Sequence, residues 1–221
     1  MNSIKTRFPA ALFALVIATM AAAGASVASA AGAQIDREPM RWHGQSGNAH
    51  MSLVGDGATA QLVRTENGIS YSIRTEGLQA GHAYTLWVVV INNPAACTVS
   101  PCSPPVDIIG NPATNSQVIY GGGHVVGGDG QAGFGGRVST GPLPDGWFAN
   151  RGLDNPLGAG VHLVLNDHGP VLTEFMPEMI QTYRAGCTDA SLPGFFPASA
   201  KADGTPGPNT CRLWQVAIFE P

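Results

Sequence analysis

Apolar and polar residues alternate in short stretches along most of the chain, and Gly, Pro, Asn or Asp bounds each stretch. Stretches of this length that are rich in β-branched and aromatic residues are typical of β-strands. One of them, AYTLWVVVI at 83–91, is apolar on both alternating faces, which predicts an interior strand. The whole pattern predicts strands near residues 58–64, 69–75, 83–91, 117–126, 131–139, 160–166 and 212–219.

Two turn sequences join neighbouring strands of this set. TENG at 65–68 contains Asn-Gly, the strongest short hairpin signal, because both residues tolerate positive φ. GGDG at 127–130 predicts a second hairpin. Gly128, Gly130 and Gly133 also match the letters of a dinucleotide-binding loop, but a strand pattern rather than a helix follows them, so the hairpin is favoured.

One short helix is predicted near 177–184. Pro177 suits the first turn of a helix, and Gly186 is a natural C-terminal stop. The two methionines of its apolar stripe could be imagined as soft copper ligands, but at helical spacing they are predicted to pack in the core. The stripe follows the i, i+3, i+4, i+7 spacing and consists of Leu172, Phe175, Met176, Met179, Ile180 and Tyr183.

These elements predict an all-β fold, an antiparallel β-sandwich of about seven strands and Greek-key type with long loops. The 29 glycines and 17 prolines agree with many turns and little helix. We expect one domain over residues 31–221, with residues 31–55 as an N-terminal arm of weaker periodicity. The Cys-Trp-Cys pattern of immunoglobulin domains is not met, because Cys97 and Cys102 fall in a Pro-rich loop.

Residues 1–30 have the three parts of a secretory signal peptide. Lys5 and Arg7 precede an apolar run over 8–23, and ASA at 28–30 precedes the expected cleavage point. The apolar run is shorter than the roughly 20 residues that a membrane-spanning helix needs. We therefore expect an exported protein, periplasmic or extracellular, with no membrane span after signal cleavage.

The charge balance argues against two classes of partner. The chain carries 11 Lys and Arg against 15 Asp and Glu, a formal net charge of −4, and it has no block of basic residues. Nucleic acid and anionic membrane surfaces require such a positive footprint, so neither is expected as a partner. The sequence indicates no other partner.

All four cysteines follow the expected cleavage point. In an oxidising compartment they predict two disulfides, with three possible connectivities. We favour Cys97–Cys102, which closes a short loop, and Cys187–Cys211, which would tether a long polar loop to the last strand. The alternative is a four-thiolate zinc site, but that site needs two close pairs, and only Cys97 and Cys102 are close in sequence.

The segment GVHLVLNDHGP at 160–170 holds two of the six histidines. As a strand it directs Val161, Leu163 and Leu165 to the core and His162 to the opposite face. His168 is predicted to lie in the following turn. It would be about 20 Å from His162, because each strand residue adds about 3.3 Å, so the two cannot share an ion unless the chain folds back.

Histidines from several strands could still form a metal site. His124 lies in GGGHVVGG at 121–128, where glycines permit a close approach of a neighbouring chain. We expect each histidine to be a structural imidazole, bonded to backbone or water, or simply exposed. The alternative is a mononuclear site in which His162 meets His124, with His82 or His168 as a further ligand and copper or zinc as the metal.

Four segments carry a family resemblance: GLQAGHAYTLW at 77–87, GHVVGGDGQAGF at 123–134, VHLVLNDHGP at 161–170 and CRLWQVAIF at 211–219. Together they resemble a group of secreted bacterial and archaeal β-sandwich proteins. More distantly, the strand pattern is similar to chordin-type domains and to the copper/zinc superoxide dismutase sandwich. The resemblance implies the architecture only, because the dismutase family begins its copper site with a His-x-His pair and this chain lacks that spacing.

The residues do not specify an enzyme. The chain has no GxSxG nucleophile motif, and its carboxylates form no pair whose spacing predicts a shared face. We therefore expect a disulfide-stabilised binding or structural module without catalytic residues or a cofactor. The alternative is a periplasmic copper or zinc protein that uses His124 and His162. The loop at 191–208 is expected to contribute to recognition.

Overall fold

The fold is that of a computed structural model, which describes residues 32–192, 196 and 205–221. Residues 31–221 form one compact unit. The predicted signal peptide, and much of the predicted recognition loop, lie outside the described residues. None of the helices in the described part of the chain is both long and apolar enough to span a bilayer.

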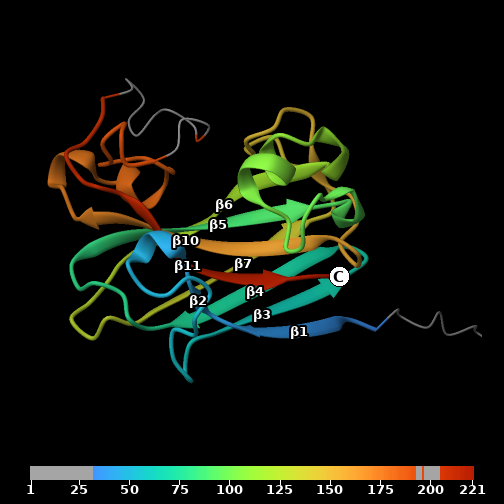
Figure 1. Ribbon diagram of the computed structural model, residues 1–221, viewed down its shortest axis with the longest axis horizontal. Coiled ribbons are helices and arrows are strands. Elements are labelled where there is room, and N and C mark those ends of the chain that lie inside the picture. The colour runs from blue at the N-terminus through green and yellow to red at the C-terminus, as the bar shows by residue number, and fades with distance from the viewer. Residues whose placement is uncertain (1–31, 193–195, 197–204) are drawn as a thin grey trace, which may run out of the picture. The chain divides into compact units, whose positions relative to one another are not determined.

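Two antiparallel sheets form the frame of this unit (Figure 1). Sheet A has the strand order β1-β3-β4-β7, and sheet B has the order β2-β11-β10-β5-β6. Two further strands, β8 and β9, pair only with each other. The strands are β1 (Gln34–Pro39), β2 (Arg41–Trp42), β3 (Thr59–Thr65), β4 (Gly68–Thr75), β5 (His82–Ile91), β6 (Ser116–Val125), β7 (Ala132–Ser139), β8 (Gly141–Pro142), β9 (Gly152–Leu153), β10 (Gly160–Pro170) and β11 (Arg212–Phe219).

The predicted sandwich and its strands are confirmed. Each of the seven predicted segments overlaps one of the strands β3, β4, β5, β6, β7, β10 and β11. The strand β5 lies between β10 and β6, as its two apolar faces indicate. The turn at 65–68 forms the expected hairpin between β3 and β4. Residues 34–42, which the sequence placed in an arm, instead supply β1 to sheet A and β2 to sheet B.

The GGDG turn differs from its prediction. It joins β6, at the edge of sheet B, to β7, at the edge of sheet A, and these two strands do not pair with each other. β6 pairs with β5 and β7 pairs with β4 instead. A glycine-rich turn allows a reversal within one sheet and a crossing between two sheets equally well, so the turn sequence alone could not distinguish them.

Helical segments of the described residues are short and lie in the connections. The regular helix predicted near 177–184 does not form: within this range the structure has only the three-residue 3₁₀ helix η6, and another, η5, ends before Pro177, which has no N–H to continue a helix. Three residues of the apolar stripe, Phe175, Met179 and Tyr183, are buried, and the other three are partly buried. The helical segments are η1 (Gly44–Ser46), η2 (Pro94–Ala96), η3 (Pro104–Ile109), η4 (Pro112–Thr114), η5 (Thr173–Phe175) and η6 (Glu178–Ile180).

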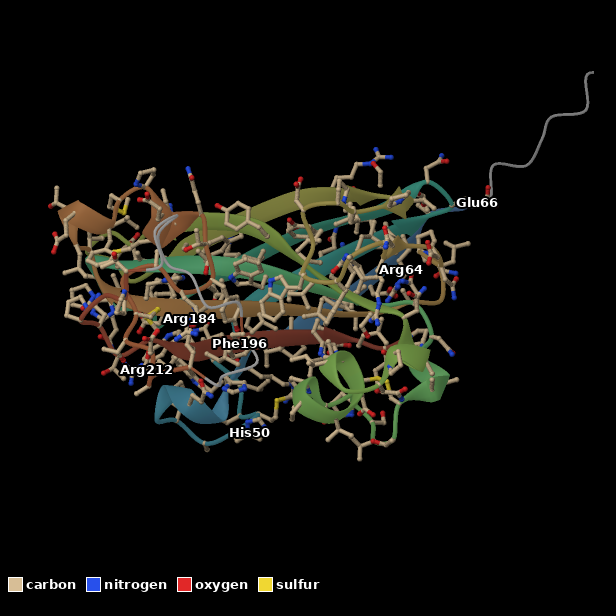
Figure 2. The ribbon with its side chains drawn as sticks, turned by 90° about the horizontal axis from the view of Figure 1, so that it is seen from above. His50, Arg64, Glu66, Arg184, Phe196 and Arg212 are labelled. Carbon is tan, nitrogen blue, oxygen red and sulfur yellow. A yellow bond between two sulfur atoms is a disulfide. The ribbon has the colours of Figure 1, made fainter. Side chains whose placement is uncertain are left out.

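The outer face of sheet B is covered by long connections. In Figure 1 the green segment after β5 and the orange segment after β10 lie at opposite ends of these strands. Figure 2 shows His50 and the green segment on the same side of the red strand β11. Apolar residues from the sheet and its cover form a second core, which includes Trp87, Val89 and Tyr183. The central strands β10 and β5 of sheet B are therefore buried on both faces, whereas the edge strand β6 is partly exposed.

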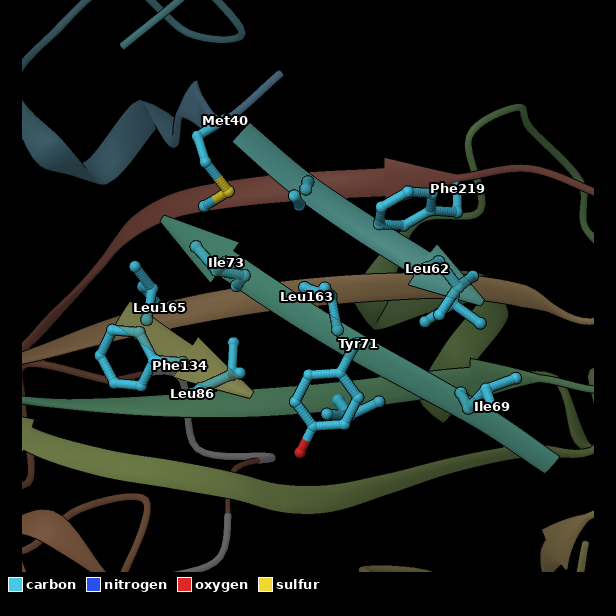
Figure 3. Close-up of a cluster of buried hydrophobic side chains, with 14 of the residues drawn as sticks. Met40, Leu62, Ile69, Tyr71, Ile73, Leu86, Phe134, Leu163, Leu165 and Phe219 are labelled. Atoms are coloured by element: carbon cyan, nitrogen blue, oxygen red, sulfur yellow. The ribbon is translucent and has the colours of Figure 1, made fainter. Parts of the chain in front are cut away.

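The main core lies between the two sheets (Figure 3). The alternation predicted for β10 is confirmed, because Val161, Leu163 and Leu165 all face this core. Burial of one such aliphatic side chain stabilises the fold by roughly 1.5–3 kcal/mol. Other large members of the core are Leu62, Ile69, Tyr71, Ile73, Leu86, Phe134 and Phe219.

Candidate functional site

The two histidines on which the predicted metal site depended lie on opposite faces of sheet B. His124 pairs with Tyr84 of β5, which faces the main core, and its ring contacts Phe134 edge-on at 6.3 Å between centroids. His162 pairs with Val89, which faces the cover. Directly paired residues share a face, and five strand residues add roughly 16 Å, so His124 and His162 do not form the predicted shared site.

His168 lies in strand β10 and not in the predicted turn. A register irregularity after Asp167 keeps the chain paired with β5 as far as Pro170. The buried His168 ring donates from Nδ1 to the Ala185 carbonyl at 2.8 Å and accepts at Nε2 from the Thr85 hydroxyl at 2.7 Å. Burial lowers the pKa of His168 to about 4. Both ring nitrogens are satisfied, so His168 has a structural role.

Both favoured disulfides are confirmed. Cys97 and Cys102 are bonded at 2.01 Å, and Cys187 and Cys211 at 1.96 Å. Among the described residues, one set of three His, Cys, Asp or Glu donors lies within 4.8 Å, and it consists of His168, Cys187 and Cys211. Thiolates bind metals, whereas these two sulfurs are bonded to each other, so the oxidised protein has a buried disulfide beside an imidazole.

His82 belongs to a different cluster, at the ends of β5 and β10. Its Nδ1 lies 2.9 Å from a carboxylate oxygen of Asp167, a residue with only 1% of its surface exposed. The same carboxylate accepts a hydrogen bond from the Gly169 N–H at 2.9 Å and lies 3.6 Å from the Arg212 guanidinium. The group is a partly buried ion pair with a backbone anchor, a common structural use of Asp and His.

Two adjoining cavities under the cover of sheet B were not predicted, and His162 lines both of them. The smaller has a volume of about 50 Å³ and the larger about 290 Å³. His162 is 6% exposed, and no hydrogen-bond partner is found for its ring among the described residues. Burial lowers its pKa to about 4, so the imidazole is neutral near pH 7.

The walls of the larger cavity come from three parts of the chain. Strands β10 and β11 supply the floor, where His162 and Val164 alternate with the core-facing residues. Residues 101–104 form a second wall, which the Cys97–Cys102 disulfide closes. Asp107 fixes this loop, because its carboxylate accepts hydrogen bonds from the backbone N–H groups of Thr98 at 2.7 Å and Ser103 at 2.8 Å.

The third wall carries two more histidines. His43 and His50 meet edge-on with ring centroids 5.8 Å apart, and Met51 lies beside them on the cavity. Burial, and then the neighbouring His50, lower the pKa of His43 to about 4. These residues flank a polar turn in the region that the sequence left as an arm. No periodic signal indicates that they approach His162, which is more than a hundred residues away in sequence.

Aromatic residues line the smaller cavity. Tyr183 contacts Trp87 at 4.8 Å, Trp147 at 4.9 Å and Phe196 at 4.4 Å between ring centroids. Three of these rings, from Trp87, Trp147 and Tyr183, also line an open cleft of about 490 Å³. The cavities and the cleft therefore adjoin one another along the covered face of sheet B.

Searches for related proteins found no matching protein family, curated protein or solved structure. The resemblance to chordin-type domains and to superoxide dismutase stays a prediction. The fold and the site define a disulfide-stabilised antiparallel β-sandwich protein with cavities on one covered sheet face. Largely apolar cavities with few polar groups are typical of small-molecule sites, which makes binding the chemistry to test.

Proposed function

We propose that this protein is an exported binding module that takes a small, uncharged and largely apolar molecule into the larger His162 cavity. One observation carries the proposal: His162 is buried, lacks a hydrogen-bond partner among the described residues and lines the cavity. The ring nitrogens of His162 are not among the fully buried unpartnered atoms of the described residues, so they are accessible from the cavity. A ligand with one hydroxyl or carbonyl group would form a hydrogen bond with the imidazole there.

The lining determines the charge of the ligand. Neither of the two cavities is lined by Asp, Glu, Lys or Arg. His43 and His162 have pKa values near 4, so their rings are neutral at neutral pH. Moving a charged group into such surroundings is strongly unfavourable, whereas a neutral hydroxyl needs only one partner. The proposed ligand is therefore uncharged.

The volume sets the size of the ligand. Apolar cavities of about 150 Å³ accommodate a molecule of benzene. The larger cavity has about 290 Å³. A molecule of about ten to twelve non-hydrogen atoms, with a ring or branched hydrocarbon body, would fill that space. Val164, Val216 and Ile218 would contact the hydrocarbon body.

Copper or zinc is the competing ligand. Imidazoles of His43, His50 and His162 and the thioether of Met51 line the larger cavity, and such donors suit copper. These three histidines are not among the donor sets of the described residues that converge within 4.8 Å. A metal would need the histidines to move, whereas a small molecule would bind to the cavity as it stands.

The substitution His162→Leu is expected to remove ligand binding without weakening the fold. Calorimetric titration with 4-propylphenol should show binding to the natural protein and at least about tenfold weaker binding to the variant, a change of about 1.4 kcal/mol. The free energy of unfolding should change little, because leucine has a similar volume and no hydrogen bond of the described residues is lost.

His124→Leu is the matched control, since it makes the same change at an exposed histidine outside the two cavities. Equal affinity of the natural protein and His162→Leu for 4-propylphenol would contradict the proposal. So would stoichiometric copper or zinc in the natural protein that disappears with the same substitution. Phenol and 4-ethylphenol complete the series, and their affinities should increase with chain length as the cavity fills.

A further inference from the structure

The open cleft beside the smaller cavity has a chemical character of its own. Four aromatic side chains, two polar side chains and one carboxylate line its volume of about 490 Å³. The aromatic residues come from β5, β6 and two separate connections, so the cleft exists only in the folded chain. Its lining residues are Trp87, Tyr120, Asp145, Trp147, Gln181, Thr182 and Tyr183.

The aromatic rings are inclined to one another. The plane of Trp87 makes angles of 73° with Tyr120, 54° with Trp147 and 62° with Tyr183. Trp147 and Tyr183 meet at 83°. The rings therefore pack against one another, and because all four also line the cleft, a ligand in it would meet ring surfaces of more than one orientation.

The walls are held in place before any ligand arrives. Trp87 donates from Nε1 to the Thr85 hydroxyl at 2.9 Å. Tyr120 donates its hydroxyl proton to the Ile180 carbonyl. Tyr183 is buried and packs against Phe196 on its far side, whereas Tyr120 keeps 41% of its surface exposed at the rim. A ligand would therefore enter past Tyr120 and meet fixed rings.

The charge of the cleft has one sign. Asp145 lies exposed at its rim and has no ion-pair partner among the described residues. No Lys or Arg belongs to the lining, and the chain as a whole has a net charge of −4. Aromatic faces and a free carboxylate both attract positive charge.

We propose that this cleft binds an organic cation, an alkylated ammonium group that the rings of Trp87, Tyr120 and Trp147 surround and Asp145 neutralises. Aromatic walls on several sides recognise quaternary ammonium groups because the cation interacts with each ring face and needs little water. A sugar ring is the other common partner of aromatic side chains, but it has no positive charge for Asp145 to neutralise. The cleft shares Trp87, Trp147 and Tyr183 with the smaller cavity but no lining residue with the larger one, so this proposal does not depend on the ligand of the larger cavity.

A charged ligand and its neutral isostere test the proposal directly. Choline and 3,3-dimethylbutan-1-ol have nearly the same shape, but only choline has the positive charge. Titration followed by tryptophan fluorescence should show binding of choline and at least about tenfold weaker binding of the alcohol. The affinity for choline should fall at high salt concentration, because salt screens the attraction between the cation and the exposed Asp145 carboxylate.

Substitutions inside and outside the cleft test whether choline binds there. Tyr120→Leu and Asp145→Asn should each weaken choline binding by about threefold to tenfold, whereas Tyr120→Phe keeps the ring and should retain most of the affinity. Asp56→Asn removes the same charge from an exposed turn outside the cleft and should have no effect. The substitution His162→Leu should also leave choline binding intact, which separates this test from that of the cavity.

Equal affinity for choline and the alcohol would overturn the proposal, as would the absence of choline binding to the folded natural protein. Binding of a neutral monosaccharide that Tyr120→Leu removes would assign the cleft to a sugar instead. Near-ultraviolet circular dichroism of each variant verifies that the aromatic cluster is still packed, so a loss of affinity reports on the cleft and not on unfolding.

Discussion

Replacement of both Cys187 and Cys211 by alanine is expected to lower the free energy of unfolding by about 3.5 kcal/mol, because the disulfide closes a long loop. The two cysteines are 24 residues apart in sequence, and each has 1% of its surface exposed. The loss of the cross-link frees the unfolded chain and gives it more conformational entropy. Chemical denaturation of the natural and the substituted protein measures the difference.

The same substitution is expected to weaken ligand binding. The tethered segment places Leu192 and Phe196 in the second core, and Phe196 lines the smaller cavity. It also supports the disulfide through backbone hydrogen bonds, such as that from the Gly207 N–H to the Cys187 carbonyl at 2.9 Å. A looser segment would expose the cavities to water and reduce the affinity for 4-propylphenol.

The other disulfide is the control for this prediction. Cys97 and Cys102 are only 5 residues apart, so their replacement by alanine should lower the free energy of unfolding by about 2 kcal/mol on the same entropic argument. An equal or larger loss in this second variant would show that loop length does not determine the contribution of the disulfides.

Acidification from pH 6.5 to pH 4.5 is expected to destabilise the folded protein strongly. Burial lowers the pKa values of His162 and His168 to about 4, and that of His43 to about 4 with the help of the nearby His50. In the unfolded chain the same rings have pKa values near 6.5. Between these values the unfolded state binds more protons than the folded state, so stability falls as the pH falls.

Each fully buried histidine contributes a slope of up to about 1.4 kcal/mol per pH unit across that window, and the less buried His43 contributes less. Denaturation at several pH values between 4.5 and 7.5 measures the slope. Asp107 does not contribute in this range, because the N–H of Thr98 and that of Ser103 hold its pKa below the ordinary value. His162→Leu should reduce the slope by the share of one histidine, and an unchanged slope in this variant would contradict the prediction.

The strands were predictable because their signal is local. Alternation within eight or ten residues indicates a strand, and apolar residues on both faces of β5 indicate that both are covered. The positions of the four cysteines likewise favoured the disulfide pairing that the structure has, one pair 5 and the other 24 residues apart. These predictions did not depend on which strands pair. They therefore hold even though β6 and β7, predicted to form a hairpin, lie in different sheets.

The candidate site could not be predicted in the same way, because it depends on register. The pairing of β5 with β6 shifts between Leu86 and Trp87, and that of β10 with β11 shifts between Leu165 and Asn166. Such irregularities re-aim side chains, and a shift of one residue moves a side chain to the other face. A sequence pattern for His124 and His162 holds no information about these shifts.

The cavity wall formed by His43 and His50 was missed for another reason. These residues lie in an irregular segment that is held against β11, where the His43 N–H donates to the Trp214 carbonyl at 3.0 Å. Composition marks that segment as polar and loosely patterned, and His43 becomes partly buried only when this distant strand packs against it. Sites built from connections between strands generally escape periodicity arguments for this reason.

The segment that supplies β1 and β2 has a further consequence, for the solubility of the protein. β1 covers the free backbone edge of β3, and β2 covers part of the edge of β11, with Met40 buried between them. Open strand edges are templates for pairing between molecules and lead to aggregation. A single short segment near the start of the folded unit thus covers one edge of each sheet, and a proteolytic cut that released it would expose the backbone edges of β3 and β11 to pairing with other chains.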